Sequence, residues 1–168
     1  MALNYGFFKE LVEAIGPSGY EHDAVEVWKK EISSVAKDVS VDVVGSGIAR
    51  IGAADGLKVM ISTHIDEIGY MIRYIDKEGY LYFEPLGGVD RHVMPGNRIA
   101  IKTRNGIVRG VIGRKPIHLI ESKERDAVSQ IQDLGIDIGA ASDEEAKKLV
   151  SIGDCAVTAV GYEELGGN

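Results

Sequence analysis

Apolar side chains recur every three or four positions near the start of the chain, at Phe8, Leu11, Val12 and Ile15. This spacing predicts a helix over residues 5–15. A second apolar stripe, running from residue 24 to residue 35, predicts another helix. Between them, "SGYE" at residues 18–21 has the spacing of a capping box, so the second helix is expected to begin there.

The pattern then changes from helical spacing to alternation. In "DVSVDVV", residues 38–44, valines alternate with polar residues, which predicts a half-buried strand. The following "GSGIARIG", residues 45–52, is expected to be its hairpin partner. The apolar run "LKVMIST", residues 57–63, predicts a strand buried on both faces.

Short strands separated by turns are predicted for residues 69–112, and no helical pattern interrupts them. Asn105 and Gly106 form a strong hairpin signal between the last two of these strands. Closely spaced strands with turn residues between them are typical of a small barrel or sandwich.

After a polar loop at residues 121–126, the apolar "IDIGA" spans residues 136–140. Ser142 and Glu145 have capping-box spacing and predict a short helix ending near Val150. "DCAVTAV", residues 154–160, predicts a further strand.

The architecture therefore changes near Gly69, from α/β before it to mainly β after it. The first part offers two helices and about three strands, whereas a sheet covered by helices typically has about five or six strands. This shortfall indicates that the α/β part is incomplete.

Composition excludes several functional classes. Apolar residues make up 45% and charged residues 27% of the chain, as in an ordinary globular protein. The net charge is −7 and the 19 Lys and Arg residues are scattered, which argues against nucleic acid as a partner. The single cysteine, Cys155, is expected to be a buried thiol in a reducing, cytoplasmic protein. Neither a signal peptide nor a membrane-spanning run is expected.

The candidate chemistry lies in "KVMISTHIDEIGYMI", residues 58–72. His64 is expected at the C-terminal end of a buried strand, the edge where α/β sheets bind ligands. Asp66 would lie on the same side and could orient the imidazole, while Glu67 would point away. Spacing alone leaves open whether His64 binds a metal or is a structural histidine, and one His and one Asp do not complete a catalytic zinc site.

The other candidate polar residues are expected to have structural rather than catalytic roles. His22 is expected to be exposed, His92 to have a structural or interface role, and His118 to be a buried, hydrogen-bonded imidazole. Asp154 is expected at a turn or strand start, and the acidic residues at 163–164 in solvent. The sequence has no nucleophile-elbow, Walker or dinucleotide-binding fingerprint.

Five ordered motifs together resemble the M42 family of metallo-aminopeptidases, the glutamyl or deblocking aminopeptidases that include the tetrahedral TET particles and some proteins labelled endoglucanases. The motifs are "IGPSGYE", "STHIDEIGYMI", "LGGVDRHVMPGNRIAIKTRNGIVRGVIGRKPIHL", "DLGIDIGAASDEEAKKLVSIGD" and "GYEELGGN". They extend over nearly the whole chain and are far more specific than the His-x-Asp triplet alone.

The resemblance implies an α/β zinc-exopeptidase domain with an inserted β-rich, PDZ-like dimerisation domain. Residues 1–69 would be the N-terminal segment of the catalytic domain, residues 70–160 the dimerisation domain, and residues 161–168 the strand returning to the catalytic domain. It also implies peptide substrates, a homodimer that can assemble into a dodecamer, and two divalent metals, zinc or cobalt. His64 would be a metal ligand, and Asp66 the catalytic-site acid that orients it.

One departure from the family pattern is large. The family's bridging Asp, its Glu-Glu pair, a further Asp and a final His all follow the segment that "GYEELGGN" matches, and residues 1–168 contain none of them. Residues 1–168 alone are therefore expected to hold no catalytic metal and to be inactive. Two alternatives stay open: a non-catalytic dimerisation or interaction module, and, less favoured, a glycan hydrolase, which would need two suitably separated carboxylates.

Overall fold

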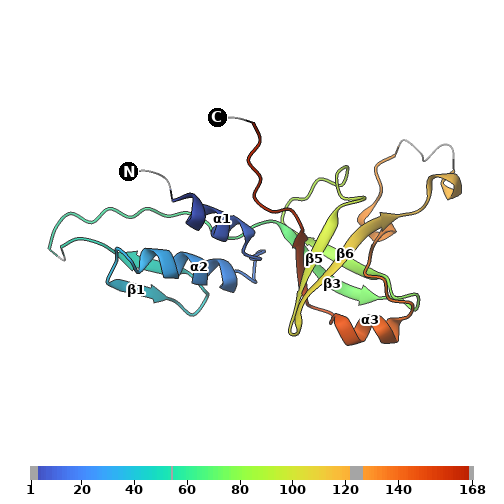
Figure 1. Cartoon of the computed structure of the whole chain (residues 1–168), viewed down its shortest axis with the longest axis horizontal. Coiled ribbons are helices and arrows are strands. Elements are labelled where there is room, and N and C mark those ends of the chain that lie inside the picture. Colours follow the sequence, from blue (N-terminus) through green and yellow to red (C-terminus); the bar gives the residue numbers. More distant parts are fainter. Residues whose placement is uncertain (1–3, 54, 122–126, 167–168) are drawn as a thin grey trace. The chain divides into compact units, whose positions relative to one another are not determined.

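The computed structural model describes residues 4–53, 55–121 and 127–166, in two compact units. Unit 1 comprises Met1–Glu67 and Gly161–Asn168, and unit 2 comprises Ile68–Val160. The predicted loop at residues 121–126 lies, except for its first residue, outside the described residues. Each unit is described by itself below, with the elements labelled as in Figure 1.

Both helices predicted for unit 1 are present. Helix α1 (Tyr5–Glu13) begins at the N-cap Asn4, whose side chain accepts a hydrogen bond from the Phe7 backbone N–H at 3.2 Å. Helix α2 (His22–Ile32) buries Ala24 and Val25 from its apolar stripe. The two helices pack against each other (Figure 1).

The predicted capping box at the start of α2 is wrong. Glu21 occupies the N-cap position with a helical backbone, and it makes no side-chain capping bond. The Ser18 hydroxyl instead donates a hydrogen bond to the carboxylate of Asp66, which lies 48 positions further along the chain. The Ser18 hydroxyl, which local spacing predicted to cap α2, therefore forms a tertiary hydrogen bond instead.

The predicted hairpin of unit 1 is confirmed, but the prediction that its first strand is half-buried is wrong, because that strand is mostly exposed and ends at Val41. Strand β1 (Asp38–Val41) pairs antiparallel with β2 (Gly47–Arg50), with Asp38 opposite Arg50. The Trp28 ring of α2 lies over Gly47 so closely that a Cβ atom added there would be 2.4 Å from Trp28 Cζ3. Glycine at this position therefore allows the helix to pack on the hairpin.

The buried strand predicted for residues 57–63 is absent. These residues have no regular secondary structure and every one is exposed, with Leu57 95%, Met60 88% and Ile61 91% accessible (Figure 1). A strand needs a neighbour to satisfy its backbone groups, and none of the described strands pairs with this run. The apolar pattern is that of a buried strand, but nothing among the described residues covers it.

Unit 2 is a closed six-stranded barrel in the order β3-β4-β7-β6-β5-β8. Its strands are β3 (Gly69–Ile75), β4 (Leu81–Leu86), β5 (Arg98–Thr103), β6 (Gly106–Arg114), β7 (Leu134–Asp137) and β8 (Cys155–Thr158). All pairings in it are antiparallel. The expectation of a barrel or sandwich is thus resolved as a barrel, and every predicted strand of residues 69–112 is present.

The inward-facing side chains of the barrel form one apolar core. The largest fully buried members are Tyr70, Ile72, Leu81, Phe83, Met94, Ile99, Ile101, Ile112, Leu134 and Ile136. Tyr70 and Phe83 pack edge to face, with ring centroids 4.9 Å apart. Cys155 is buried in β8, as the sequence predicted.

The hairpin between β5 and β6 is confirmed, with a different turn from the one its sequence suggests. Thr103 pairs with Gly106, so Arg104 and Asn105 occupy the tip of the turn. Only Gly106 among these residues has a positive φ, of 117°. A turn followed by a positive-φ glycine is a common alternative to the two-residue Asn-Gly turn.

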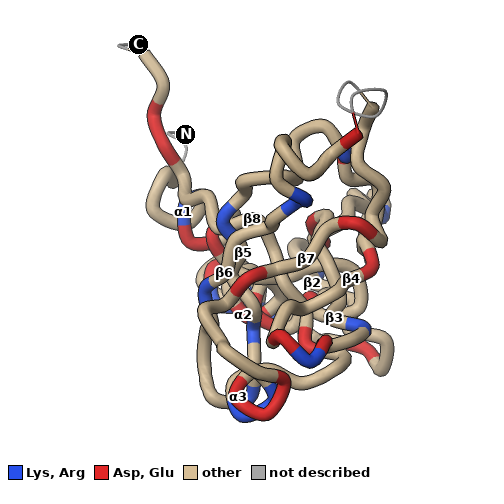
Figure 2. Tube along the Cα trace, turned by 90° about the vertical axis from the view of Figure 1, so that its right-hand side faces the viewer, with Lys and Arg blue, Asp and Glu red and all other residues tan. Residues whose placement is uncertain are grey.

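Helix α3 (Asp143–Leu149) begins at Ser142, whose side chain accepts from the Glu145 backbone N–H at 3.3 Å, as the capping box predicted. Its first turn is acidic and its last turn carries Lys147 and Lys148, an arrangement that favours the helix dipole. Figure 2 shows both kinds of charge on this helix.

The prediction that His118 is buried is wrong. His118 lies in a single 3₁₀ turn, η1 (Ile117–Leu119), in which no residue is buried and the neighbouring Ile117 and Leu119 are 51% and 56% exposed. The second 3₁₀ turn, η3 (Ile131–Asp133), leads into β7. None of the helices in the described part of the chain is long and apolar enough to span a membrane.

Gly110 tests how tightly the barrel is packed. A Cβ atom at this position of β6 would lie 2.6 Å from Ile136 Cγ2 and 2.9 Å from the Asp137 carbonyl oxygen. Because backbone cannot move aside cheaply, Gly110→Ala is expected to lower the free energy of unfolding by about 1–3 kcal/mol. Urea unfolding measures this loss, with amide exchange of β6 and β7 as the local readout. Gly88→Ala, whose Cβ would meet nothing within 4 Å, is the matched control; equal stability of the two variants would contradict the prediction.

Candidate functional site

His64 and Asp66, the two residues singled out in the sequence, are in contact in unit 1. His64 Nδ1 lies 3.0 Å from Asp66 Oδ1 and 3.1 Å from the Asp66 carbonyl oxygen. The His64 side chain is 83% exposed. When Nδ1 donates its proton to the carboxylate, Nε2 carries the free lone pair, which is the form in which an imidazole binds a metal.

Asp66 is held from two sides. One carboxylate oxygen faces His64, and the other accepts a hydrogen bond from the Ser18 hydroxyl. The Ser18 bond is the main cause that lowers the pKa of Asp66, the His64 contacts lower it further, and partial burial opposes them. The carboxylate is therefore stabilised in the ionised form that orients a neighbouring imidazole.

Glu67 has a separate role from Asp66. Its Oε1 accepts from the Gly16 backbone N–H at 3.1 Å, and its own backbone N–H donates to the Gly16 carbonyl at 3.0 Å. Pro17 and Glu67 form an isolated parallel bridge. Burial raises the pKa of the Glu67 carboxyl. The two adjacent carboxylates thus serve different partners, in line with the predicted divergence of their side chains.

The described residues do not assemble a multi-ligand metal site. They contain no cluster of three or more His, Cys, Asp or Glu residues able to hold an ion. His64 fits the role of one ligand, because its Nδ1 is engaged and its ring is exposed. A stable catalytic zinc site has about three protein ligands, so this residue alone does not make one.

The remaining polar candidates lie outside this group. His22, exposed as predicted, is the first residue of α2. Asp154 accepts from the Ser151 backbone N–H at 2.8 Å, in the turn before β8, as predicted. His92 is exposed in a loop of unit 2, and its Nδ1 lies 2.8 Å from Asp90 Oδ1. The sequence reading overlooked this second imidazole–carboxylate pair, although its Asp-x-His spacing is the reverse of His64-x-Asp66.

Ser18 is the one member of the site that sequence reasoning assigned to another role. Its signal, a serine in "GPSG", was equally that of a helix cap. No periodicity connects positions 48 residues apart, so only the folded chain could pair Ser18 with Asp66.

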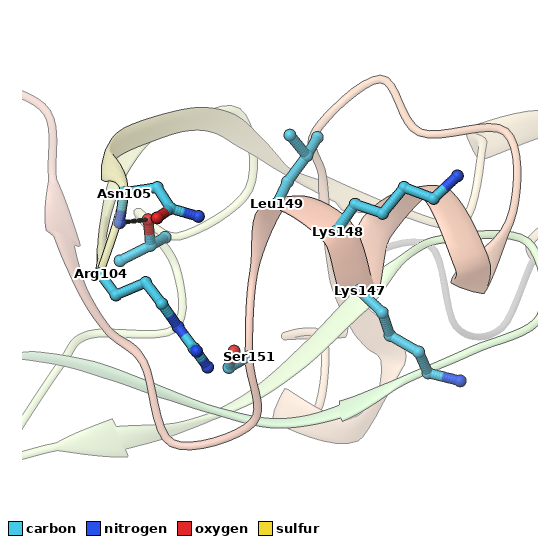
Figure 3. A pocket seen from close by; sticks show the side chains of 7 residues that line it. Arg104, Asn105, Lys147, Lys148, Leu149 and Ser151 are labelled. Carbon is cyan, nitrogen blue, oxygen red and sulfur yellow. Dashed lines mark hydrogen bonds between the residues drawn. The ribbon is translucent and has the colours of Figure 1, made fainter.

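A surface pocket of about 230 Å³ lies wholly within unit 2, between the β5–β6 turn and α3 (Figure 3). Its lining residues are Thr103, Arg104, Asn105, Lys147, Lys148, Leu149 and Ser151. Figure 3 shows the Arg104 guanidinium near Ser151, with both lysine side chains extending away from it. Since no imidazole, carboxylate or thiol lines it, this pocket lacks the side chains that ordinarily bind zinc.

The lowered pKa of Asp66 predicts a pH-dependent contribution to stability. Asp66 stabilises the fold above its ordinary pKa of about 3.9, and this stabilisation is lost as the pH falls through the lowered folded-state pKa. Asp66→Asn, which cannot ionise, is therefore expected to be less stable than the wild type near neutral pH, with the difference shrinking in acid. Urea unfolding followed by Trp28 fluorescence at several pH values measures it. A difference that does not change with pH would contradict the prediction.

Comparisons with known proteins identify the family of the chain. Residues 45–168 match the sequence model of the M42 glutamyl aminopeptidase family. The lysyl aminopeptidase of Pyrococcus furiosus is 36% identical over 150 residues, which are 88% of this chain and 43% of that protein. The chain thus spans less than half the length of this relative.

Two solved structures have the same fold. The crystal structure of a TET aminopeptidase from the marine sediment archaeon Thaumarchaeota archaeon SCGC AB-539-E09 superposes with a TM-score of 0.92 at 36% identity, covering 96% of this chain and 46% of that one. The TET1 peptidase of Pyrococcus horikoshii, which can assemble into a tetrahedron or a large octahedral shell, gives a TM-score of 0.81 at 40% identity, covering 92% and 46%. With the match of the family model over most of its length, this chain belongs to the M42 family of glutamyl aminopeptidases.

Proposed function

We propose that this chain is part of a metal-dependent aminopeptidase that removes N-terminal residues from peptides. The observation that carries the proposal is the exposed His64 imidazole, whose Nδ1 is bound by Asp66 so that Nε2 is left as the ligating nitrogen. Two divalent ions, zinc or cobalt, would polarise the scissile carbonyl and activate the attacking water when bound.

The chain's own residues have defined parts in this proposal. His64 would hold one ion through Nε2. Asp66 accepts the Nδ1 proton, fixes the tautomer and keeps the ring from rotating. Glu67 is not the general base in this proposal, because its carboxylate is engaged by the Gly16 backbone N–H at 3.1 Å. The remaining ligands and the general base are proposed to lie in the part of the peptidase that this chain does not span, since the described residues contain no cluster of three ligands.

The alternative of an interaction module is less well supported. Strand addition needs an exposed sheet edge, and the six-stranded barrel of unit 2 is closed. Glycan hydrolysis needs two carboxylates across a substrate. Asp66 and Glu67 are adjacent, and their carboxylates have different partners. The Asp66 carboxylate contacts His64 and Ser18, and the Glu67 carboxylate contacts the Gly16 backbone. Neither alternative accounts for the oriented imidazole.

Activity measurements test the proposed chemistry. A polypeptide of residues 1–168 is expected to hydrolyse no aminoacyl-p-nitroanilide with added Zn²⁺ or Co²⁺, because one imidazole cannot hold a catalytic ion. In a longer polypeptide that completes the peptidase, His64→Ala is expected to abolish turnover. Asp66→Asn is expected to weaken metal binding or activity by about 10–100-fold, the usual effect of removing a residue that orients a ligand.

His118→Ala supplies the matched control, since His118 is exposed on a 3₁₀ turn of unit 2. Its turnover should equal that of the unchanged enzyme. Tight stoichiometric metal binding and turnover by residues 1–168 alone would contradict the proposed division of the site. Full activity of the longer His64→Ala variant would contradict the role of His64.

Unit 2 is proposed to be the PDZ-like dimerisation domain of this peptidase. Support comes from the barrel's exposed large apolar side chains, which include Val93 (59%), Ile107 (47%) and Ile152 (64%). Further support comes from the assemblies that the related TET1 peptidase forms. Homodimers could then associate further into a dodecamer.

Solution mass tests the dimerisation proposal. The monomer mass is 18.1 kDa, and sedimentation equilibrium is expected to give about twice that value at micromolar concentration. A strict monomer would contradict a self-sufficient dimerisation domain. Because the exposed apolar run at residues 57–61 could also cause association, the Met60→Lys variant is the control. It should retain the dimer if unit 2 forms the interface.

A further inference from the structure

The Ser18 hydroxyl of unit 1 is hydrogen-bonded to the candidate site. It donates to Asp66 Oδ2, while Asp66 Oδ1 faces His64 Nδ1 at 3.0 Å. The three side chains therefore form a continuous series from a hydroxyl through a carboxylate to the imidazole. The series ends at His64 Nε2, on a side chain that is 83% exposed.

We infer that Ser18 is a positioning residue of the M42 site, whose hydroxyl holds the Asp66 carboxylate in the orientation that fixes the His64 tautomer. The inference rests on the proposed role of His64 as a metal ligand. A carboxylate bound by only one neighbour can rotate about its Cβ–Cγ bond. A donor on the second oxygen prevents this rotation and keeps Oδ1 facing the imidazole.

The backbone around Ser18 is fixed to the same segment. The Glu67 backbone N–H donates to the Gly16 carbonyl at 3.0 Å, and the Gly16 backbone N–H donates to the Glu67 carboxylate at 3.1 Å. Pro17 bridges Glu67 in parallel, and the Tyr20 backbone N–H closes a turn onto the Pro17 carbonyl at 2.8 Å. The backbone at Ser18 is thus held near Asp66 by contacts of neighbouring residues, and these contacts do not involve the Ser18 side chain.

A role for Ser18 as a helix cap does not account for these contacts. Helix α2 has Glu21 as its N-cap and no side-chain capping bond. The Glu21 carboxylate accepts from the Gly19 backbone N–H at 2.7 Å. The Ser18 hydroxyl has Asp66 as its partner instead, so its removal should disturb the imidazole more than the helix.

Two-bond ¹H–¹⁵N correlation spectra of the 168-residue chain measure this effect directly, because they report which nitrogen of each neutral imidazole carries the proton. For the unchanged chain we expect His64 to be protonated on Nδ1. Ser18→Ala should shift His64 to a mixture that includes the Nε2-protonated form. Ser18→Thr, which keeps a hydroxyl, should restore the Nδ1-protonated form. The signals of His92 and His118 in unit 2 should not change.

Ser33→Ala is the matched control, because the Ser33 hydroxyl donates to the Lys29 carbonyl at 2.7 Å at the end of α2, away from Asp66. This variant should leave the His64 tautomer unchanged. An unchanged His64 spectrum in Ser18→Ala would overturn the inference, as would a Ser18→Thr variant that behaves like Ser18→Ala. Changes extending to the histidines of unit 2 would also overturn it, since they would show a general loss of structure.

The measurement uses no metal and no substrate, so its outcome is separable from that of the proposed function. If His64→Ala leaves a completed peptidase active while Ser18→Ala still changes the tautomer, the proposed function fails and the contact through Asp66 stands. If His64 is essential and the tautomer is indifferent to Ser18, the proposed function stands and this inference fails.

Discussion

The hydrogen bonds between residues 16–18 and residues 66–67 are the constraint on which the candidate site depends. Two bonds join Gly16 to Glu67, and the Ser18 hydroxyl reaches Asp66. The preceding run, residues 57–63, has no regular structure of its own and is exposed throughout. The bonds with residues 16–18 thus fix the segment that carries His64, and they give Asp66 and Glu67 different tasks.

Unit 2 is stabilised by a different principle. Its six strands close on themselves, so their backbone groups find partners within the barrel and the inward side chains share one core. Unit 1 has a two-stranded sheet and leaves the apolar side chains of Leu57, Met60 and Ile61 in solvent. A large exposed apolar run marks a surface that is normally covered. This difference agrees with a chain that spans less than half of its relatives' length.

Local patterns predicted most elements, because local forces determine them. Local patterns predicted five of the six barrel strands, the Ser142 cap of α3 and the β5–β6 hairpin, which depend on alternation, on a side chain three residues away, or on a turn. Strand β7 was not predicted, because residues 136–140 were recognised only as an apolar run. The errors arose where a distant partner was decisive. The Ser18 hydroxyl bonds Asp66 and does not cap α2, and none of the described strands pairs with residues 57–63, where a strand was predicted. His118 was predicted to be buried from its apolar flanks, but those flanks are themselves exposed.

The sequence by itself determined the family, five of the six barrel strands and the pairing of His64 with Asp66, since these follow from ordered motifs and from residues close together in the chain. Only the tertiary structure decided that the barrel closes, that Glu67 binds the Gly16 backbone and that Ser18 occupies the second oxygen of Asp66. The physical reason is the range of the interactions. Hydrogen bonds between residues about 50 positions apart leave no periodic trace in the sequence, and they form only once the backbone has brought those residues together.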